Sequence, residues 1–253
     1  MRLSERLACE SSELRAKLYA MADDADMRVR YQLAFSLGEL DDPARNTALA
    51  EIARRDPSDR WIRLAVFSSL ATGAGEVFSA LAADSKWRSG GDGRALLGEL
   101  ARYIGRRNRR DEIAHVVKSL EALPGAQIAV AAAIVRGLAD GMSKQGDGTL
   151  RDRLAALDSD KARQVLDDML ATAKARAADD AAEPAARVDA IRLLALGDFA
   201  ESGPILSPLV SSQQPHDVQS AALGTLAKFA DPSIAATLIE AWPSLSPRIK
   251  SEA

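Results

Sequence analysis

Hydrophobic residues recur at helical spacing in the segment Asp26–Pro43, and later segments of the chain repeat its pattern. The apolar positions are Val29, Leu33, Leu37 and Leu40. Steps of three or four residues place these side chains on one side of a helix and leave polar residues on the other. The segment therefore predicts an amphipathic helix of about three turns.

Both ends of this helix carry recognisable signals. Asp26 precedes the first apolar position, where its carboxylate can accept a hydrogen bond from an N–H of the first turn. Asp41-Asp42-Pro43 follows the last apolar position, and proline lacks an N–H and disfavours helix in the residue before it. Gly38 is small, as expected where a neighbouring helix approaches closely.

The same pattern recurs at steps of roughly thirty residues, as in helical repeat proteins. The positions that align with Val29 are Ile62, Leu96, Ile128, Val188, Val218 and Ile249. The match over 218–232 is the best, whereas the alignment places Arg136 and Arg192 on core positions. The periodicity predicts helices at about 3–21, 26–40, 47–55, 61–71, 76–83, 95–105, 109–122, 126–140, 160–178, 186–198, 202–211, 216–229 and 232–241. The predicted fold class is all-α, a right-handed α-solenoid of about six or seven helical-hairpin repeats.

The repeated segments resemble HEAT-like repeats, which are armadillo-like helical hairpins. The residues that carry the resemblance are Val29-Arg30, Ala34, Leu37-Gly38, Leu40 and Asp42-Pro43, together with Ala222, Leu226 and Asp231-Pro232. The resemblance covers nearly the whole chain and implies a helical scaffold. It implies little about function, because HEAT repeats serve many roles.

Three stretches look like a narrower group of proteins. These are Val29–Leu40, Asp59–Arg63 with Ser68-Ser69-Leu70, and Ala101–Asn108. They look like the HEAT segment of large exported bacterial proteins, in which a propeller-type membrane-bound dehydrogenase-like domain precedes the repeats and a c-type haem domain follows. The resemblance implies an exported or periplasmic location and a spacer or docking role between redox domains. The chain lacks Cys-x-x-Cys-His, so this segment is not expected to hold covalent haem.

A single HEAT-like repeat domain is expected over residues 1–253, as a fragment of a longer chain. The segment 141–159 interrupts the repeats as an insertion, and the glycine-rich residues 85–94 are expected to form a loop. Pro247–Lys250 restarts the pattern. We therefore expect a partly exposed apolar end around Leu238, Trp242 and Leu245.

Composition and motifs favour a non-enzymatic protein without cofactors or metals. The net charge is −3, and the single cysteine, Cys9, excludes an internal disulfide and a cysteine-rich metal site. The two histidines, His115 and His216, have no ligand partner at a suitable spacing, and no phosphate-binding loop or nucleophile motif is present. No apolar run is long enough to span a membrane, so no membrane insertion is expected.

The candidate partner-binding residues lie on the template helix, away from its apolar stripe. They are Tyr31, Gln32, Phe35 and Glu39. Tyr31 and Phe35 are four residues apart, so their rings are neighbours on the face that lines the concave side of such repeats. Exposed aromatic residues are enriched at protein interfaces. The alternative is that both rings pack against the preceding N-terminal helix.

A basic cluster spans the end of the helix predicted at 95–105 and the turn after it. Its members are Arg102, Arg106, Arg107, Arg109 and Arg110, which are candidate anion-binding residues. Cations also favour the C-terminal end of a helix, so a solvated turn is the simpler explanation of the cluster. Some HEAT-like proteins are DNA glycosylases with a basic groove, and a nucleic-acid-binding module of that type is the alternative function.

The sequence thus predicts a structural scaffold that binds a protein partner or orders the neighbouring domains of its parent chain. Nucleic acid is not an expected partner, because the overall charge is slightly negative.

Overall fold

The computed structural model is all-α. It describes residues 5–8, 10–125, 127–142, 160–229, 231–245 and 247–252, and these contain no β-strand. The helical content of 78% confirms the prediction of a predominantly helical protein without sheets. The predicted insertion lies, from residue 143 onward, outside the described residues; Gly141 and Met142 end a helix.

The chain divides into two compact units, Met1–Gly146 and Asp147–Ala253, and each is described by itself. The helices of the first unit are α1 (Glu5–Ala8), α2 (Ser12–Ala20), η2 (Met21–Asp23), α3 (Met27–Gly38), α4 (Ala44–Arg55), α5 (Arg60–Ser68), α6 (Ala74–Ala83), α7 (Ser85–Ser89), α8 (Gly91–Arg107), α9 (Arg110–Glu121) and α10 (Ile128–Met142). Those of the second are α12 (Asp160–Ala178), α13 (Pro184–Leu194), α14 (Phe199–Leu209), α15 (His216–Leu226), α16 (Ser233–Ala241), η3 (Trp242–Ser244) and α17 (Pro247–Glu252). The single domain expected over 1–253 stays a prediction.

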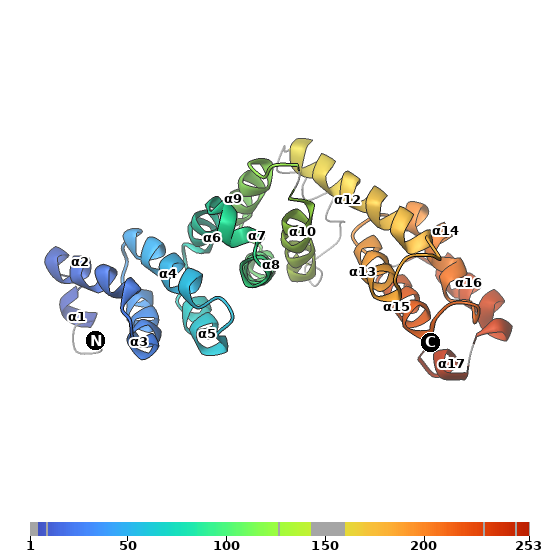
Figure 1. Ribbon diagram of the computed structural model, residues 1–253, viewed down its shortest axis with the longest axis horizontal. Coiled ribbons are helices and arrows are strands. Elements are labelled where there is room, and N and C mark those ends of the chain that lie inside the picture. Colours follow the sequence, from blue (N-terminus) through green and yellow to red (C-terminus); the bar gives the residue numbers. More distant parts are fainter. Residues whose placement is uncertain are drawn as a thin grey trace. The chain divides into compact units, whose positions relative to one another are not determined.

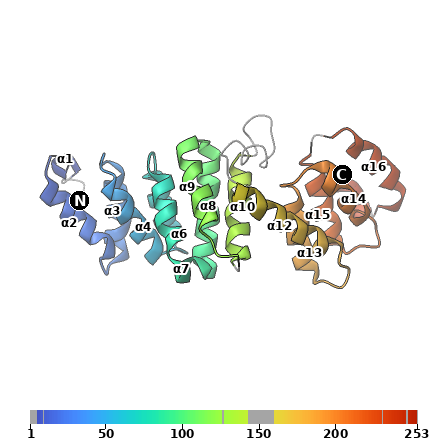
Figure 2. The same cartoon turned by 90° about the horizontal axis from the view of Figure 1, so that it is seen from above.

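Helices of the first unit pack in two rows. In one row α2 contacts α4, α4 contacts α6 and α6 contacts α9. In the other, α3 contacts α5 and α8 contacts α10. Helices that follow one another in the chain pack across the rows, as α4 does with α3 and α5. Figures 1 and 2 show these helices succeeding one another along the unit.

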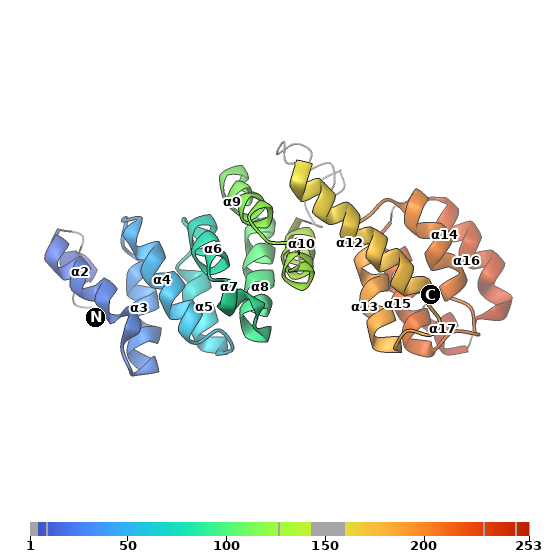
Figure 3. The ribbon, with the colours of Figure 1, turned by 45° about the horizontal axis from the view of Figure 1, so that its top comes forward.

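The second unit has a similar order of contacts. Helix α12 packs on α13 and α14, and α15 contacts α13, α14 and α17. Figure 3 shows the long helix α12 running past α13 and α14. The core of this unit includes Ile191, Leu206, Ala222 and Ile249, all almost inaccessible to solvent.

Aspartate caps explain where several helices of the first unit begin. Asp26 accepts a hydrogen bond from the Arg28 N–H at 2.8 Å, which confirms its predicted role. Asp59 accepts from Trp61 N–H and Ile62 N–H at 2.9 and 2.8 Å. Each cap therefore fixes the first turn of a helix in the row that contains α3 and α5.

The prediction of a loop over residues 85–94 is wrong, because most of this segment is helical. Asp84 caps α7 by accepting from the Trp87 N–H at 2.9 Å. The backbone is extended only at Gly90, and α8 begins at Gly91. A Cβ atom at Gly93 would lie 3.0 Å from the Trp87 ring, so this glycine permits close packing between α7 and α8.

The predicted alignment is also wrong in register at two helices. Arg192 was placed on a core position but is exposed, and Ala190 and Ile191 are buried instead. Ile128, aligned with Val29, is 58% exposed, whereas Val130 is buried. A shift of two residues turns a helix face by more than half a turn, so these two segments bury a different stripe from the one expected.

Helices α8 and α10 are in contact through their backbones. The residues at this crossing are Gly98 and Gly105 on α8 and Gly137 and Gly141 on α10. A Cβ atom at Gly105 would lie 2.5 Å from the Leu138 carbonyl oxygen, and one at Gly137 would lie 2.9 Å from the Gly98 carbonyl carbon. Glycine is required at this crossing because a side chain would need the space that the opposite backbone occupies. The predicted close approach at Gly38 is confirmed too, by Ser69, which directly follows α5.

Four arginines are buried in the helical packing. They are Arg30, Arg45, Arg88 and Arg187, each at most 7% exposed. Each guanidinium donates to backbone carbonyls near the end of a neighbouring helix. The last carbonyls of a helix have no N–H partner within that helix, and each arginine satisfies such carbonyls. The same hydrogen bonds offset the free-energy cost of burying the guanidinium.

The apolar end expected around Leu238, Trp242 and Leu245 is only partly present. Trp242 is 44% exposed and Ile239 is 73% exposed. The prediction of exposure is wrong for Leu245, which is 4% exposed and belongs to the core of the second unit. Helix α17 packs on α15 and carries Ile249 into the same core.

Candidate binding surface

Three of the four predicted partner-binding residues lie on α3, and Glu39 directly follows it. Phe35 is 37% exposed and Glu39 is exposed, whereas Tyr31 and Gln32 are half-buried. The Tyr31 and Phe35 rings meet edge to face, with centroids 5.1 Å apart. This geometry is favourable for aromatic pairs and stabilises both rings in one orientation.

The neighbouring helix α5 extends this surface. Trp61 and Leu64 are 61% and 49% exposed. Trp61 borders a groove of about 400 Å³ between α3 and α5, opposite Met27 and Tyr31. We call Met27, Tyr31, Phe35, Trp61 and Leu64 the apolar face.

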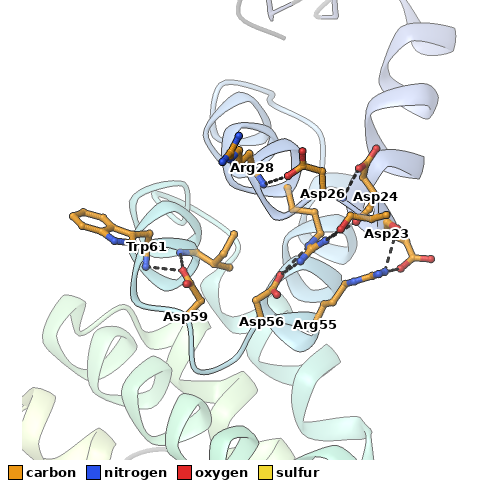
Figure 4. A network of polar contacts seen from close by, with 11 residues as sticks. Asp23, Asp24, Asp26, Arg28, Arg55, Asp56, Asp59 and Trp61 are labelled. Carbon is orange, nitrogen blue, oxygen red and sulfur yellow. Dashed lines mark hydrogen bonds and ion pairs between the residues drawn. The ribbon is translucent and has the colours of Figure 1, made fainter.

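Buried and capping charges hold the groove in shape. The Arg30 guanidinium, in α3, pairs with Asp56 in the turn before α5, with Nε and Nη2 at 2.8 and 2.6 Å from Oδ2. Arg55 at the end of α4 pairs with Asp23 in η2. Figure 4 shows these contacts together with the Asp26 and Asp59 caps, and shows the Trp61 ring pointing away from the network. These contacts thus fix the positions of the helices that border the groove.

Two cations stand beside the groove. Arg28 is exposed and lines it, and the Arg60 guanidinium lies 5.6 Å from the centroid of the Trp61 ring. The carboxylate that borders the groove, Asp59, is engaged by two N–H groups at the start of α5. The groove therefore combines apolar walls with two exposed guanidinium groups and one hydrogen-bonded carboxylate at its edge.

The sequence predicted two of the five residues of the apolar face and missed the other three. Tyr31 and Phe35 were identified, but Met27, Trp61 and Leu64 were not. A signal for Leu64 was present, because the alignment of Val29 with Ile62 places Tyr31 on Leu64. Trp61 gave no comparable signal, since exposure at the first turn of a helix depends on what the neighbouring helix covers.

The predicted anion-binding arginines are exposed or half-buried, and Arg107 and Arg109 form hydrogen bonds within the protein. Arg107 donates to the Ala71 carbonyl at 2.7 Å, and Arg109 donates to the same oxygen at 3.4 Å. Tyr103, under the Arg107 guanidinium, donates to the Leu70 carbonyl at 2.9 Å. The cluster therefore stabilises the turn after α5, while its role in anion binding stays a prediction.

Glu112, in the first turn of α9, is a buried carboxyl group beside this cluster. Its side chain is 3% exposed, and Arg109 Nη1 lies 3.8 Å from its Oε1. Burial raises the pKa of Glu112, and the positive charge of Arg109 opposes that shift only in part. Ionised Glu112 consequently costs the folded state free energy.

This cost predicts a pH-dependent effect of Glu112→Gln. Because the folded-state pKa is raised, the cost is absent below the unfolded value of about 4.5 and grows as pH rises through the folded pKa. We expect the variant to melt at a higher temperature than the wild type near pH 7 and at the same temperature near pH 4, measured by circular dichroism. Glu76→Gln, at an exposed site on α6, is the control and should show no such difference. An equal effect of Glu112→Gln at both pH values would contradict the prediction.

The ring of His115, on α9, contacts α6. His115 Nδ1 is 3.1 Å from the Ser79 hydroxyl, and the ring packs over Gly75. Within the part of the chain that the structure describes, no group of three or more His, Cys, Asp or Glu side chains is placed to hold a metal ion. The same residues include no helix both long and apolar enough to cross a membrane.

Comparison of the chain with protein-family models, curated proteins and solved structures finds no match. The helical architecture is shown by the structure, and no family is identified for the chain.

Proposed function

We propose that the chain is a non-enzymatic scaffold that binds a protein partner through the apolar face. The observation that carries this proposal is a cluster of five large apolar side chains on two adjacent helices, α3 and α5, of which four are exposed and three line a groove. Contiguous exposed apolar surface with a polar rim is typical of interaction sites. Aromatic anchors beside a pocket are the usual centre of binding energy.

The order of helix contacts supports a HEAT-like interpretation of the scaffold. Each unit builds from helix pairs in which alternate helices contact one another, as in stacked helical hairpins. In that interpretation the apolar face belongs to the second helices of successive repeats. A spacer or docking role in a larger exported redox protein is the context that the sequence resemblance favours.

The test of this proposal is a selection from a random peptide library displayed on phage. We expect peptides to be enriched on the wild-type protein and to bind the double variant Phe35→Ala, Trp61→Ala at least about 30-fold more weakly, since interface anchors contribute about 2 kcal/mol or more. The melting temperature should change little, because both side chains are exposed.

The matched control removes two exposed apolar side chains elsewhere. Ile239→Ala, Trp242→Ala in the second unit should leave peptide binding unchanged. The proposal fails if no peptide is enriched, or if the Phe35 and Trp61 variant binds as well as the wild type. It also fails if that variant loses about 3–5 kcal/mol of stability, which would identify the two rings as core residues.

A further inference from the structure

We infer that the partner of the apolar face is an acidic, amphipathic peptide segment, with leucine-like side chains flanked by carboxylates. This inference rests on the proposed function and specifies the chemistry of the partner. Three features of the groove support it: its size, the charges on its rim and the state of its nearest carboxylates.

The size of the groove suits side chains rather than a flat surface contact. Its volume of about 400 Å³ falls in the usual range of about 300–1,000 Å³ for sites that enclose a ligand group. Met27, Tyr31 and Trp61 form its walls. Apolar side chains spaced along one face of a peptide can enter such a groove between two helices.

Two exposed cations lie at the rim, and no ion pair joins either of them to a carboxylate of the residues that the structure describes. Arg28 lines the groove and is exposed, and Arg60 lies against the Trp61 ring. By contrast, Arg63 on the same helix pairs with Glu99, with Nη1 3.3 Å from Oε1. Arg28 and Arg60 are therefore the cations that an incoming carboxylate would meet at the edge of the groove.

The two nearest carboxylates oppose an acidic partner less than free carboxylates would. Asp26 and Asp59 accept hydrogen bonds from the first N–H groups of α3 and α5. Their charges are thereby directed at the positive ends of these helices. Glu39 is exposed but lies one residue beyond the opposite end of α3. Charge complementarity at the groove thus selects carboxylates on the partner.

The experiment uses three synthetic amphipathic peptides with the same leucine positions. The residues between the leucines are glutamate, glutamine or lysine, and binding to the intact chain is measured by isothermal titration calorimetry. We expect the glutamate peptide to bind most tightly and the lysine peptide most weakly. The advantage of the glutamate peptide should shrink as salt is added, because exposed charges are screened.

Charge variants identify the residues responsible. The double variant Arg28→Ala, Arg60→Ala should bind the glutamate peptide about tenfold more weakly at low salt, as expected for two exposed charge contacts. Its affinity for the glutamine peptide should be unchanged. Lys86→Ala, Lys118→Ala removes two exposed cations from α7 and α9 and should leave all three affinities unchanged.

The inference is overturned if the glutamine or lysine peptide binds as tightly as the glutamate peptide, or if the arginine variant affects all three equally. It is also overturned, with the proposed function intact, if none of the three binds while the phage library yields peptides that depend on Phe35 and Trp61. If neither the library nor the synthetic peptides bind, the proposed function falls as well.

Discussion

Gly137→Ala is expected to destabilise the first unit by about 3 kcal/mol, the upper end of the cost of overpacking. The new methyl group would lie 2.9 Å from the Gly98 carbonyl carbon and closer still to its oxygen. The Gly98 carbonyl group belongs to the backbone of α8, so no side chain can rotate to make room for the methyl group. The helices must separate, which removes contacts along the whole crossing of α8 and α10. Urea unfolding followed by circular dichroism measures the change.

A glycine in open space supplies the control for this effect. Gly224 lies inside α15, and a Cβ atom there meets nothing within 4 Å. Gly224→Ala should therefore stabilise its unit by up to about 1 kcal/mol, because alanine favours helix over glycine. The intrinsic preference is the same at both positions, so opposite signs isolate the close contact. If Gly137→Ala also stabilised the protein, the two helices would not be in backbone contact.

Arg45→Met is expected to destabilise the first unit by about 3–5 kcal/mol, because each buried acceptor that loses its donor costs about 1–3 kcal/mol. The Arg45 guanidinium is 5% exposed and donates to the Leu37 and Gly38 carbonyls at 3.2 and 3.0 Å. It also donates to the Thr72 carbonyl and hydroxyl at 3.1 and 2.7 Å. Methionine fills similar space but leaves these acceptors without a donor in a buried setting.

The matched substitution for Arg45→Met is Arg28→Met. Arg28 is exposed at the start of α3, so its replacement should change the free energy of unfolding by less than about 0.5 kcal/mol. Chemical denaturation of both variants gives the comparison. Equal stability of the two variants would show that water satisfies the carbonyls around Arg45 and that the side chain is dispensable.

Much of the helical structure could be predicted from the sequence because it depends on local chemistry. The apolar stripe of Leu33, Leu37 and Leu40 is buried, and Asp26 caps the helix as expected. These signals lie within a few residues of the features that they determine. The segment 160–178 is likewise helical over the expected residues.

The parts that could not be predicted depend on residues distant in the sequence. Arg30 and Arg187 are buried because carbonyls or carboxylates outside their own helices satisfy them, and a polarity pattern places such residues on the surface. This explains why the alignment missed the register of α13. Glycines that permit a helix crossing look the same in sequence as glycines that end a helix, which is why residues 85–94 were expected to form a loop.

The candidate site shows the same division. Tyr31 and Phe35 could be predicted because their exposure follows from one helix face. Trp61 could not, because its place in the groove depends on the packing of α5 against α3. The exposure of a large side chain in the first turn of a helix depends on the neighbouring helix as well as on its own.

The turn after α5 has a consequence for protein engineering. Its carbonyls at Ser69, Leu70, Ala71 and Thr72 accept hydrogen bonds from side chains of α4, α8 and the residue before α9. Short turns between helices are normally chosen as places to add tags or to open a chain by circular permutation, because their backbone binds only water. Here every added residue would displace donors on three other segments. A permutation site or an inserted label in the first unit belongs elsewhere than in this turn.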